Sequence, residues 1–322
     1  MSVEKRDSLA QCTLKQAVSF VGIGLHTGKK ASLTLRPAAT DAGINFIRKD
    51  VKPGTGFVSA RWYNVINTEL GTTIANEYGV SVNTIEHLVA ALRGCNIDNV
   101  LVEIDGPEIP IMDGSARPFI DLIQEAGIVE QLSPRYVIWV HRPVEYRNGD
   151  KYALLMPDAK TRYTVQIEFP SSLIGTQVSS FNYNDDDFMN FIAPARSFGF
   201  LDDIPMMKRQ GLIKGGSLEN AILVDGDEVV NKEGLRFRDE FVRHKLLDCI
   251  GDFGLVGVRV LGHFYASKPG HQLNNQFIRT LFSRRDAWSY ISLTEYHKLI
   301  GNMPDRGPRS FVQDYPRAEK MA

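Results

Sequence analysis

Two stretches of sequence decide the fold: Thr84-Ile-Glu-His-Leu-Val-Ala-Ala-Leu-Arg-Gly94 and Phe241-Val-Arg-His-Lys-Leu-Leu-Asp-Cys-Ile-Gly251. Each has the apolar spacing of a helix, with His at the fourth position and Gly seven residues after it. In the first stretch, Asn83 is the expected N-cap, Glu86 occupies the capping-box position and Gly94 is the expected C′ residue. A duplicated α+β unit explains the matched positions better than chance. It predicts two similar domains whose equivalent helices meet.

The segments around these helices predict strands and helices in both halves of the chain. Apolar and polar residues alternate over 31–36, as in a half-buried strand. Further strands are expected at 99–104, 136–140, 163–168 and 256–260, and further helices at 116–125 and at 240–250, the latter ended by Gly251. The fold class is therefore α+β, with a β-sheet packed with α-helices in each half.

The expected boundary between the two domains is Ser133-Pro134, because strand signals restart at Tyr136. We predict an N-terminal domain over residues 1–131 that contains Glu86 and His87, and a C-terminal domain over 135–300. The last segment, 301–322, is polar and rich in Pro and Arg, and is predicted to be a mobile tail.

Composition excludes several classes of function. The net charge of -1 gives no global basic field, so we expect no nucleic-acid partner. Three widely spaced cysteines form no disulfide framework and favour a reducing compartment. The sequence has no signal-peptide core and no uninterrupted apolar run of about 18 residues. We expect a cytoplasmic protein with no integral membrane contact.

The segment Arg243-His-Lys-Leu-Leu-Asp248 predicts a metal site. Residues four apart on a helix share a face, so His244 and Asp248 aim at one point. Catalytic Zn²⁺ takes three protein ligands and leaves a position for water, and His87 is the leading third ligand. Taken alone, such a pair is more often a hydrogen-bonded surface pair. Asp252 is expected on the same face, unless the helix has ended at Gly251.

Glu86 directly precedes His87, as a general base adjoins a ligand in zinc hydrolases, although the order differs from the standard H-E-x-x-H motif. His271 lies in Ser267-Lys-Pro-Gly-His-Gln-Leu-Asn-Asn275, which we interpret as a loop that could present a histidine for proton transfer. The alternative is a loop histidine bonded to backbone. His26, in a Gly-rich turn, is a weaker candidate. Dinucleotide, P-loop and serine-hydrolase motifs are absent from the sequence.

Six segments together resemble the UDP-3-O-acyl-N-acetylglucosamine deacetylase family of bacterial lipid A synthesis. The resemblance extends from about residue 13 to 290, in the family's order. The segments are Val21-Gly-Ile-Gly-Leu-His-Thr-Gly28, Thr84-Ile-Glu-His87, Pro107-Glu-Ile-Pro-Ile-Met-Asp-Gly-Ser-Ala116, Ala195-Arg-Ser-Phe-Gly-Phe200, Glu240-Phe-Val-Arg-His-Lys-Leu-Leu-Asp248 and Gly270-His-Gln-Leu-Asn-Asn275.

The resemblance implies one catalytic Zn²⁺ held by His87, His244 and Asp248. It implies that Glu86 is the general base and that His271 is the general acid. The remaining implied roles are orientation of His271 by Asp252, oxyanion binding by Lys245 and Ser197, and diphosphate binding by Lys151. Family members usually have Thr where this chain has Ser197; Ser keeps the donor but loses the methyl that restricts χ1.

The family's fold is two similar α+β domains with helices sandwiched between them and the active site at the interface. The implied reaction converts UDP-3-O-acyl-N-acetylglucosamine and water into UDP-3-O-acyl-glucosamine and acetate. We expect the protein to act as a monomer.

The apolar segment 200–223, punctuated by Pro and Gly, has two interpretations. Composition alone favours a helix or hairpin packed into the core. The resemblance implies an insert in the C-terminal domain that holds the acyl chain, with flexible Met206 and Met207 suited to its lining. The residues expected to bind the chain are Phe198, Phe200, Leu201, Ile204, Gly216, Leu218 and Leu223.

Two other functions remain open from the sequence. The first is a zinc amidohydrolase of the same architecture acting on another N-acyl sugar. The second is a non-catalytic nucleotide-binding or ribosome-associated protein, which would not need the set Glu86, His87, His244, Asp248 and His271. Metal analysis together with acetate release separates these functions.

Overall fold

The computed structural model describes residues 8–183 and 187–301, and the first half of these residues is built on a five-stranded sheet. Its strand order is β2-β3-β9-β4-β5, with β9 parallel to β4 and antiparallel to β3. The elements of this half are β1 (Ala10–Leu14), β2 (Val18–Ile23), β3 (Lys30–Pro37), β4 (Ile44–Arg48), β5 (Phe57–Ser59), η1 (Trp62–Asn64), β6 (Val65–Asn67), β7 (Thr73–Ala75), β8 (Ser81–Val82), α1 (Glu86–Gly94), β9 (Val100–Ile104), α2 (Arg117–Ala126) and β10 (Ile128–Pro134).

The second half is built on a seven-stranded sheet in which the long strand β19 pairs with β11, β13 and β14. Its elements are β11 (Tyr136–Val140), β12 (Val144–Asn148), β13 (Lys151–Met156), β14 (Thr161–Glu168), β15 (Thr176–Asn182), η2 (Phe188–Ile192), β16 (Phe198–Phe200), η3 (Leu201–Asp203), α4 (Ile204–Arg209), β17 (Ile222–Asp225), β18 (Glu228–Val229), α5 (Glu240–Gly254), β19 (Arg259–Ser267), α6 (His271–Ser283), β20 (Trp288–Ser292) and α7 (Leu293–Gly301).

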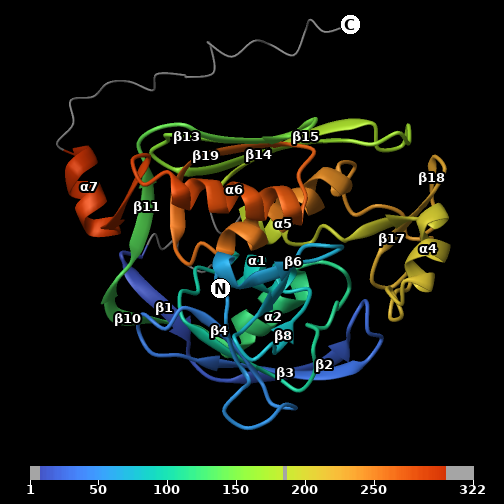
Figure 1. Ribbon diagram of the computed structural model, residues 1–322, viewed down its shortest axis with the longest axis horizontal. Helices are drawn as coiled ribbons and strands as arrows, with labels where there is room; N and C mark the ends of the chain where they lie inside the picture. The colour runs from blue at the N-terminus through green and yellow to red at the C-terminus, as the bar shows by residue number, and fades with distance from the viewer. Residues whose placement is uncertain (1–7, 184–186, 302–322) are drawn as a thin grey trace, which may run out of the picture.

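The helices form the middle of the molecule. Figure 1 shows the strands β2, β3 and β4 on one side and β13, β14, β15 and β19 on the other, with α1, α2, α5 and α6 between them. Helix α1 is buried along almost its whole length, and Leu88 to Leu92 are fully enclosed. The α+β architecture with sandwiched helices is therefore confirmed.

Helices α1 and α5 pack against each other closely enough to require glycine. A Cβ atom added at Gly251 would lie 2.2 Å from the backbone oxygen of Glu86, inside any allowed contact distance. The predicted meeting of the two repeated helices is confirmed. Gly251 was expected to end the second helix, and that prediction is wrong because α5 continues to Gly254.

Two other local predictions are wrong. Asn83 is not the N-cap of α1, since the helix begins at Glu86 after Ile85. The Asn83 N–H instead donates to Pro107 O, and Thr84 has a φ of 57°. Strand β19 begins at Arg259 rather than at residue 256.

The predicted linker Ser133-Pro134 lies at the end of strand β10, where Pro134 pairs with Ala10 of β1. The segment predicted as a mobile tail lies, from residue 302 onward, outside the described residues. Among residues 8–183 and 187–301, no helix has both the length and the apolar character needed to cross a membrane.

The predicted insert is a small layer beside the main sheets. Strands β16, β17 and β18 form a three-stranded sheet, with β16 parallel to β17, and α4 follows β16 and η3. Figure 1 shows α4, β17 and β18 projecting at one end of the molecule. The segment 200–223 is therefore a separate layer that borders a cavity, rather than a helix buried in the core.

Candidate active site

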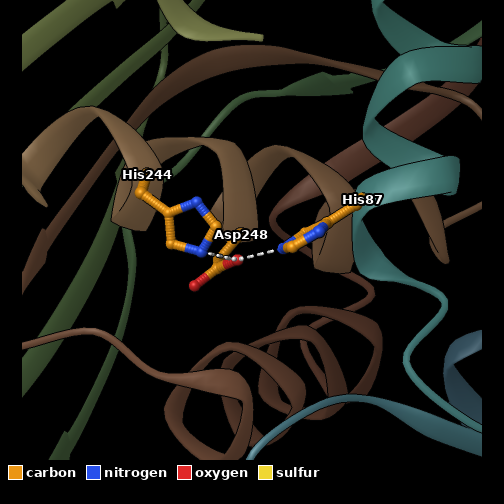
Figure 2. A group of neighbouring side chains, drawn as sticks. All are labelled: His87, His244 and Asp248. Atoms are coloured by element: carbon orange, nitrogen blue, oxygen red, sulfur yellow. Dashed lines mark ion pairs between the residues drawn. The ribbon is translucent and has the colours of Figure 1, made fainter. Parts of the chain in front are cut away.

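His87, His244 and Asp248 converge where α1 meets α5. Figure 2 shows both histidine rings directed toward the Asp248 carboxylate. Asp248 Oδ1 lies 3.5 Å from His244 Nε2 and 3.7 Å from His87 Nε2, and the three side chains are almost completely buried. Each of the three side chains offers one possible ligand atom, and these atoms lie within 4.8 Å of one another. Among the described residues, these three form the group of His, Cys, Asp or Glu side chains that could hold a metal ion.

The protonation states of His244 and Asp248 suit metal binding. Burial lowers the pKa of His244 to about 3, so its ring is neutral at pH 7. The ring is oriented by Ala195 O, which lies 3.1 Å from Nδ1 and leaves Nε2 directed toward Asp248. Burial opposes ionisation of Asp248, but Lys245 and His244 outweigh that effect and hold the pKa of its carboxyl well below the ordinary value.

The donor set fits a tetrahedral ion. Zn²⁺ binds histidine nitrogen and carboxylate oxygen at about 2.0–2.2 Å, which places neighbouring ligand atoms about 3.4 Å apart in a tetrahedron. The distances from Asp248 Oδ1 to the two imidazole nitrogens, 3.5 and 3.7 Å, are close to that spacing. Two imidazoles and a carboxylate are also a recurring catalytic zinc set.

The carbonyl that orients His244 belongs to a segment fastened to α5. Arg196 is buried and donates from Nε to Glu240 Oε1 at 2.9 Å, at the first residue of the helix. This buried ion pair holds Ala195 and Ser197 beside α5. Breaking such a pair by removing one partner typically costs about 3–5 kcal/mol.

Glu86 lies beside the metal group at the start of α1 and is only 3% exposed. Its Oε2 accepts a hydrogen bond of 2.9 Å from the Thr72 N–H. Burial raises the pKa of Glu86, against the opposing charges of His271 and His87. A carboxylate with a raised pKa is a better proton acceptor at neutral pH.

His271 faces Glu86 from the other side, with Nε2 4.0 Å from Glu86 Oε1. It was predicted in a loop, but it is the first residue of α6, after Gly270. Its Nδ1 lies 2.9 Å from Asp252 Oδ2. Burial lowers the pKa of His271, but the carboxylates of Asp252 and Glu86 outweigh burial and raise it to about 10.

Asp252 is brought into this cluster because α5 does not end at Gly251. The extra turn keeps Asp252 on the same helical face as Asp248, four residues earlier. The alternative in which Asp252 has left the helix is thereby excluded.

These groups border a polar cavity of about 320 Å³. Lys245 lines it and donates to Asp248 Oδ2 at 2.9 Å. Ser197 and Lys151 line it as well. Of the predicted catalytic residues, Glu86, His271, Lys245 and Ser197 therefore border one cavity, whereas Asp252 does not line it and contacts His271 from behind. Thr68 and Gln272 also line the cavity and were not predicted from the sequence.

A second cavity, of about 260 Å³ and mostly apolar, adjoins the first. The two share Leu25, Leu70, Ser197 and Phe198. Of the residues expected to bind an acyl chain, those that line this cavity are Phe198, Phe200, Ile204, Gly216, Leu218 and Leu223. Leu201 is not among the lining residues and is 39% exposed. Met207 lines the cavity, whereas Met206 is exposed.

Sequence analysis missed three buried polar residues that brace the site. Thr72 and Asn274 donate to Asp252, at 2.6 and 2.8 Å. Glu108 accepts from the backbone N–H groups of His26 and Thr27 and so holds the Gly-rich turn. Their partners lie up to 180 residues away in the chain, so no local spacing could have identified them.

Comparison with known sequences fits this geometry. The family described as UDP-3-O-acyl N-acetylglycosamine deacetylase matches residues 11–283. This chain belongs to that family. Relatives named UDP-3-O-acyl-N-acetylglucosamine deacetylase include the Geotalea uraniireducens protein, 47% identical over 91% of this chain and 95% of the relative. The Haemophilus influenzae protein is 44% identical over 90% of this chain and 96% of the relative, and the Vibrio campbellii protein 45% over 89% and 94%.

Proposed function

We propose that this chain hydrolyses the acetamide of UDP-3-O-acyl-N-acetylglucosamine, giving UDP-3-O-acyl-glucosamine and acetate, the committed step of lipid A biosynthesis. The supporting observation is the set of groups at one cavity. A base and an acid flank a His-His-Asp group, and an apolar cavity opens beside them. Relatives that share almost the whole chain have names stating this deacetylase activity.

The proposed cofactor is one Zn²⁺ held by His87, His244 and Asp248. When bound, the ion lowers the pKa of water toward 7 and polarises the substrate carbonyl as a Lewis acid. The support is the donor chemistry: a neutral buried imidazole in His244 and an ionised carboxylate in Asp248.

The proposed base is Glu86. It accepts a proton from the attacking water while the water oxygen forms a bond to the carbonyl carbon of the acetamide. His271 is the proposed acid. With a pKa of about 10 it is protonated at neutral pH, and it transfers that proton to the amine nitrogen as the C–N bond breaks. Asp252 orients the ring through Nδ1, so that Nε2 is the nitrogen directed at the cavity.

Two donors are proposed for the negative charge that develops on the carbonyl oxygen. Lys245 stays cationic, because the attraction of Asp248 outweighs burial and keeps the pKa of the amine raised. The Ser197 hydroxyl borders the same cavity. Loss of one such donor typically costs about 10²- to 10³-fold in rate. Lys151, exposed at the cavity edge, is proposed to bind the diphosphate.

The apolar cavity is proposed to hold the acyl chain of the substrate. Each buried methylene contributes about 0.8 kcal/mol, so removal of six carbons should cost up to about 5 kcal/mol of transition-state stabilisation, measured as a fall in kcat/KM. We expect a steep dependence on chain length in the wild type and a flatter one in Leu223→Asp. Leu201→Asp is the control, since Leu201 does not line the cavity. Equal turnover of the 3-O-unacylated sugar would contradict this assignment and favour a different N-acyl substrate.

We further propose that residues 1–131 and 135–300 form two domains, and that the protein works as a cytoplasmic monomer. The five-stranded sheet lies wholly within the first range and the seven-stranded sheet within the second. All of the groups with a proposed role in the chemistry come from one chain, so a second copy is not needed to complete the site.

The decisive experiment combines metal analysis with an acetate-release assay on UDP-3-O-acyl-N-acetylglucosamine. We expect about one zinc per chain and loss of activity on chelation that added zinc restores. Glu86→Gln is the matched control, expected to keep zinc and lose turnover. A zinc-loaded protein that releases acetate only from other N-acyl sugars would contradict the proposed substrate.

A further inference from the structure

Thr72 lies between the proposed base and the proposed acid pair. It is 2% exposed and immediately precedes β7. Its N–H donates to Glu86 Oε2 at 2.9 Å, and its hydroxyl donates to Asp252 Oδ1 at 2.6 Å. Its carbonyl accepts from the N–H of Ile85, which caps α1, at 3.3 Å. The polar groups of this one residue therefore contact both the proposed base, Glu86, and Asp252, the carboxylate that pairs with the proposed acid.

Both oxygens of the Asp252 carboxylate take part in hydrogen bonds. Oδ2 lies 2.9 Å from His271 Nδ1, and it accepts a hydrogen bond of 2.8 Å from the Asn274 side-chain amide. Oδ1 has the Thr72 hydroxyl as its partner. Because a carboxylate is planar, a donor fixed on one oxygen also fixes the direction of the other. The Thr72 hydroxyl on Oδ1 and the Asn274 amide on Oδ2 thus both restrict the orientation in which Asp252 meets the imidazole.

We propose that Thr72 is a positioning residue for the proposed hydrolysis, whose hydroxyl sets the orientation of the Asp252–His271 pair relative to Glu86. This inference rests on the proposed function. Thr72 belongs to the first half of the chain and Asp252 to α5 of the second. Its two hydrogen bonds therefore join the proposed base Glu86 to Asp252, the carboxylate that contacts the proposed acid, across the contact between the halves. His271 Nε2 lies 4.0 Å from Glu86 Oε1.

Another threonine allows this role to be separated from a general contribution to stability. Thr161 is also buried, 6% exposed, and its hydroxyl donates to Val260 O at 2.7 Å. It lies in β14, and it does not line the polar cavity. Thr→Val at either position removes a buried hydroxyl donor with little change of volume. Thr161→Val is therefore the matched control.

The test compares steady-state kinetics of Thr72→Val, Thr72→Ser and Thr161→Val in the full chain loaded with zinc. In Thr72→Val we expect kcat to fall about 10- to 100-fold, as for other residues that orient a group of a metal site. KM should change by less than about threefold, since the interaction lost acts on the reacting groups. Thr72→Ser, which retains the hydroxyl, should restore kcat, and Thr161→Val should leave it unchanged. Thr72→Ala repeats the test if Val prevents folding.

A double-mutant comparison tests whether Thr72 acts through Asp252. In an Asp252→Ala background, Thr72→Val should lower kcat little further, because residues that act as a unit are not additive. If the kcat losses of the two single variants multiply in the double variant, the proposal is overturned. A Ser variant as slow as the Val variant, or equal losses in Thr72→Val and Thr161→Val, would also overturn it.

A second readout does not depend on turnover. The proton on His271 Nδ1, assigned with His271→Ala, should give a low-field NMR signal that persists in Thr72→Ser and moves in Thr72→Val. If wild type releases no acetate, the proposed function fails while this signal still tests Thr72. An unchanged signal in Thr72→Val would overturn the positioning role.

Discussion

Helices α1 and α5 start from the same sequence pattern and end in different roles. His87 and His244 occupy equivalent positions in the two helices and both point into the site. Four residues later the helices differ: α5 has Asp248, whereas α1 has Ala91, which is fully buried in the core. Helix α5 therefore contributes two residues to the His-His-Asp group and α1 contributes one.

The residue before each histidine differs in the same way. In α1 it is Glu86, buried beside the metal group. In α5 it is Arg243, which turns outward and pairs with Asp239 at 2.6 Å. A repeated scaffold can therefore place two imidazoles opposite each other while the residues at neighbouring positions of the two helices differ. The proposed base is kept on α1, and a second proposed ligand with the proposed orienting carboxylate is kept on α5.

The largest effect is expected on removing the ligand that α5 has and α1 lacks. In Asp248→Ala, zinc content should fall and kcat/KM should drop on the order of 10⁴-fold. The reason is that the ion supplies several kcal/mol of transition-state stabilisation, and each 1.4 kcal/mol is a factor of ten. Zinc is measured by elemental analysis and activity by acetate release.

Asp239→Ala, at the N-cap of the same helix, is the control for Asp248→Ala. It removes a partly exposed carboxylate that pairs with Arg243, and both zinc and activity should stay close to wild type. Full zinc occupancy with activity in Asp248→Ala would show that this carboxylate is not a ligand.

The next effect concerns the residues that precede the two histidines. Glu86→Gln removes the proposed base but keeps the size and shape of the side chain, so kcat should fall about 10²- to 10⁴-fold while zinc remains bound. The equivalent change on α5, Arg243→Met, breaks contacts with Asp239 and with Phe191 O that lie outside the polar cavity, and should change kcat less than about twofold. Similar losses in the two variants would contradict the division of roles between the helices.

The two repeated helices and the convergence of His87, His244 and Asp248 were predictable because their signals are local. His244 and Asp248 are one helical turn apart, and the alignment with His87 supplied the third candidate ligand. Tertiary contacts decided what could not be predicted. Gly251 was taken as a stop signal, yet its missing side chain admits the backbone of Glu86. Asn83 was expected to cap α1, yet its N–H is bonded to Pro107 O.

The apolar cavity was predicted in part for a similar reason. Family resemblance located the segment, but only the fold determines which side of each residue faces the cavity. Leu223 in β17 lines it, whereas Leu201, also apolar, is turned toward solvent. Composition cannot separate these two leucines, because the direction of each side chain depends on how β16, η3 and β17 are paired and turned.

A smaller effect should follow from filling the two equivalent glycine positions. Gly251→Ala places a methyl 2.2 Å from the backbone oxygen of Glu86, so α1 must shift together with the base and His87. Displacement by about 1 Å can cost up to about 100-fold in kcat. Gly94→Ala instead meets the ring of Phe188, which lies outside the polar cavity.

Both glycine variants should be destabilised by about 1–3 kcal/mol, as is usual for overpacking. The kcat of the folded protein should fall only in Gly251→Ala. Denaturant unfolding and acetate release measured on the same samples separate the two effects. Equal activity losses in the two variants would mean that the glycines contribute through stability alone.

The smallest effect is a shift in the titration of His271 when zinc binds. In the metal-free protein, the carboxylates of Asp252 and Glu86 outweigh burial and raise the pKa of His271 to about 10, from an ordinary value of 6.5. The stability that this gives is fully present below pH 6.5 and is lost as the pH rises toward 10. A bound cation repels the protonated ring, so zinc should lower the pKa of His271 by about one unit or more.

The measurement is an NMR pH titration of the histidine signals with zinc and after chelation. His141, exposed and bonded to Ser289, is outside the site, and its pKa, lowered by partial burial and by Arg142, should not respond to zinc. The high-pH limb of kcat, which reports loss of the proton from the acid, should disappear in His271→Ala. If zinc leaves the His271 titration unchanged, then the ion binds elsewhere, and the convergence of α1 and α5 on one metal would have to be abandoned.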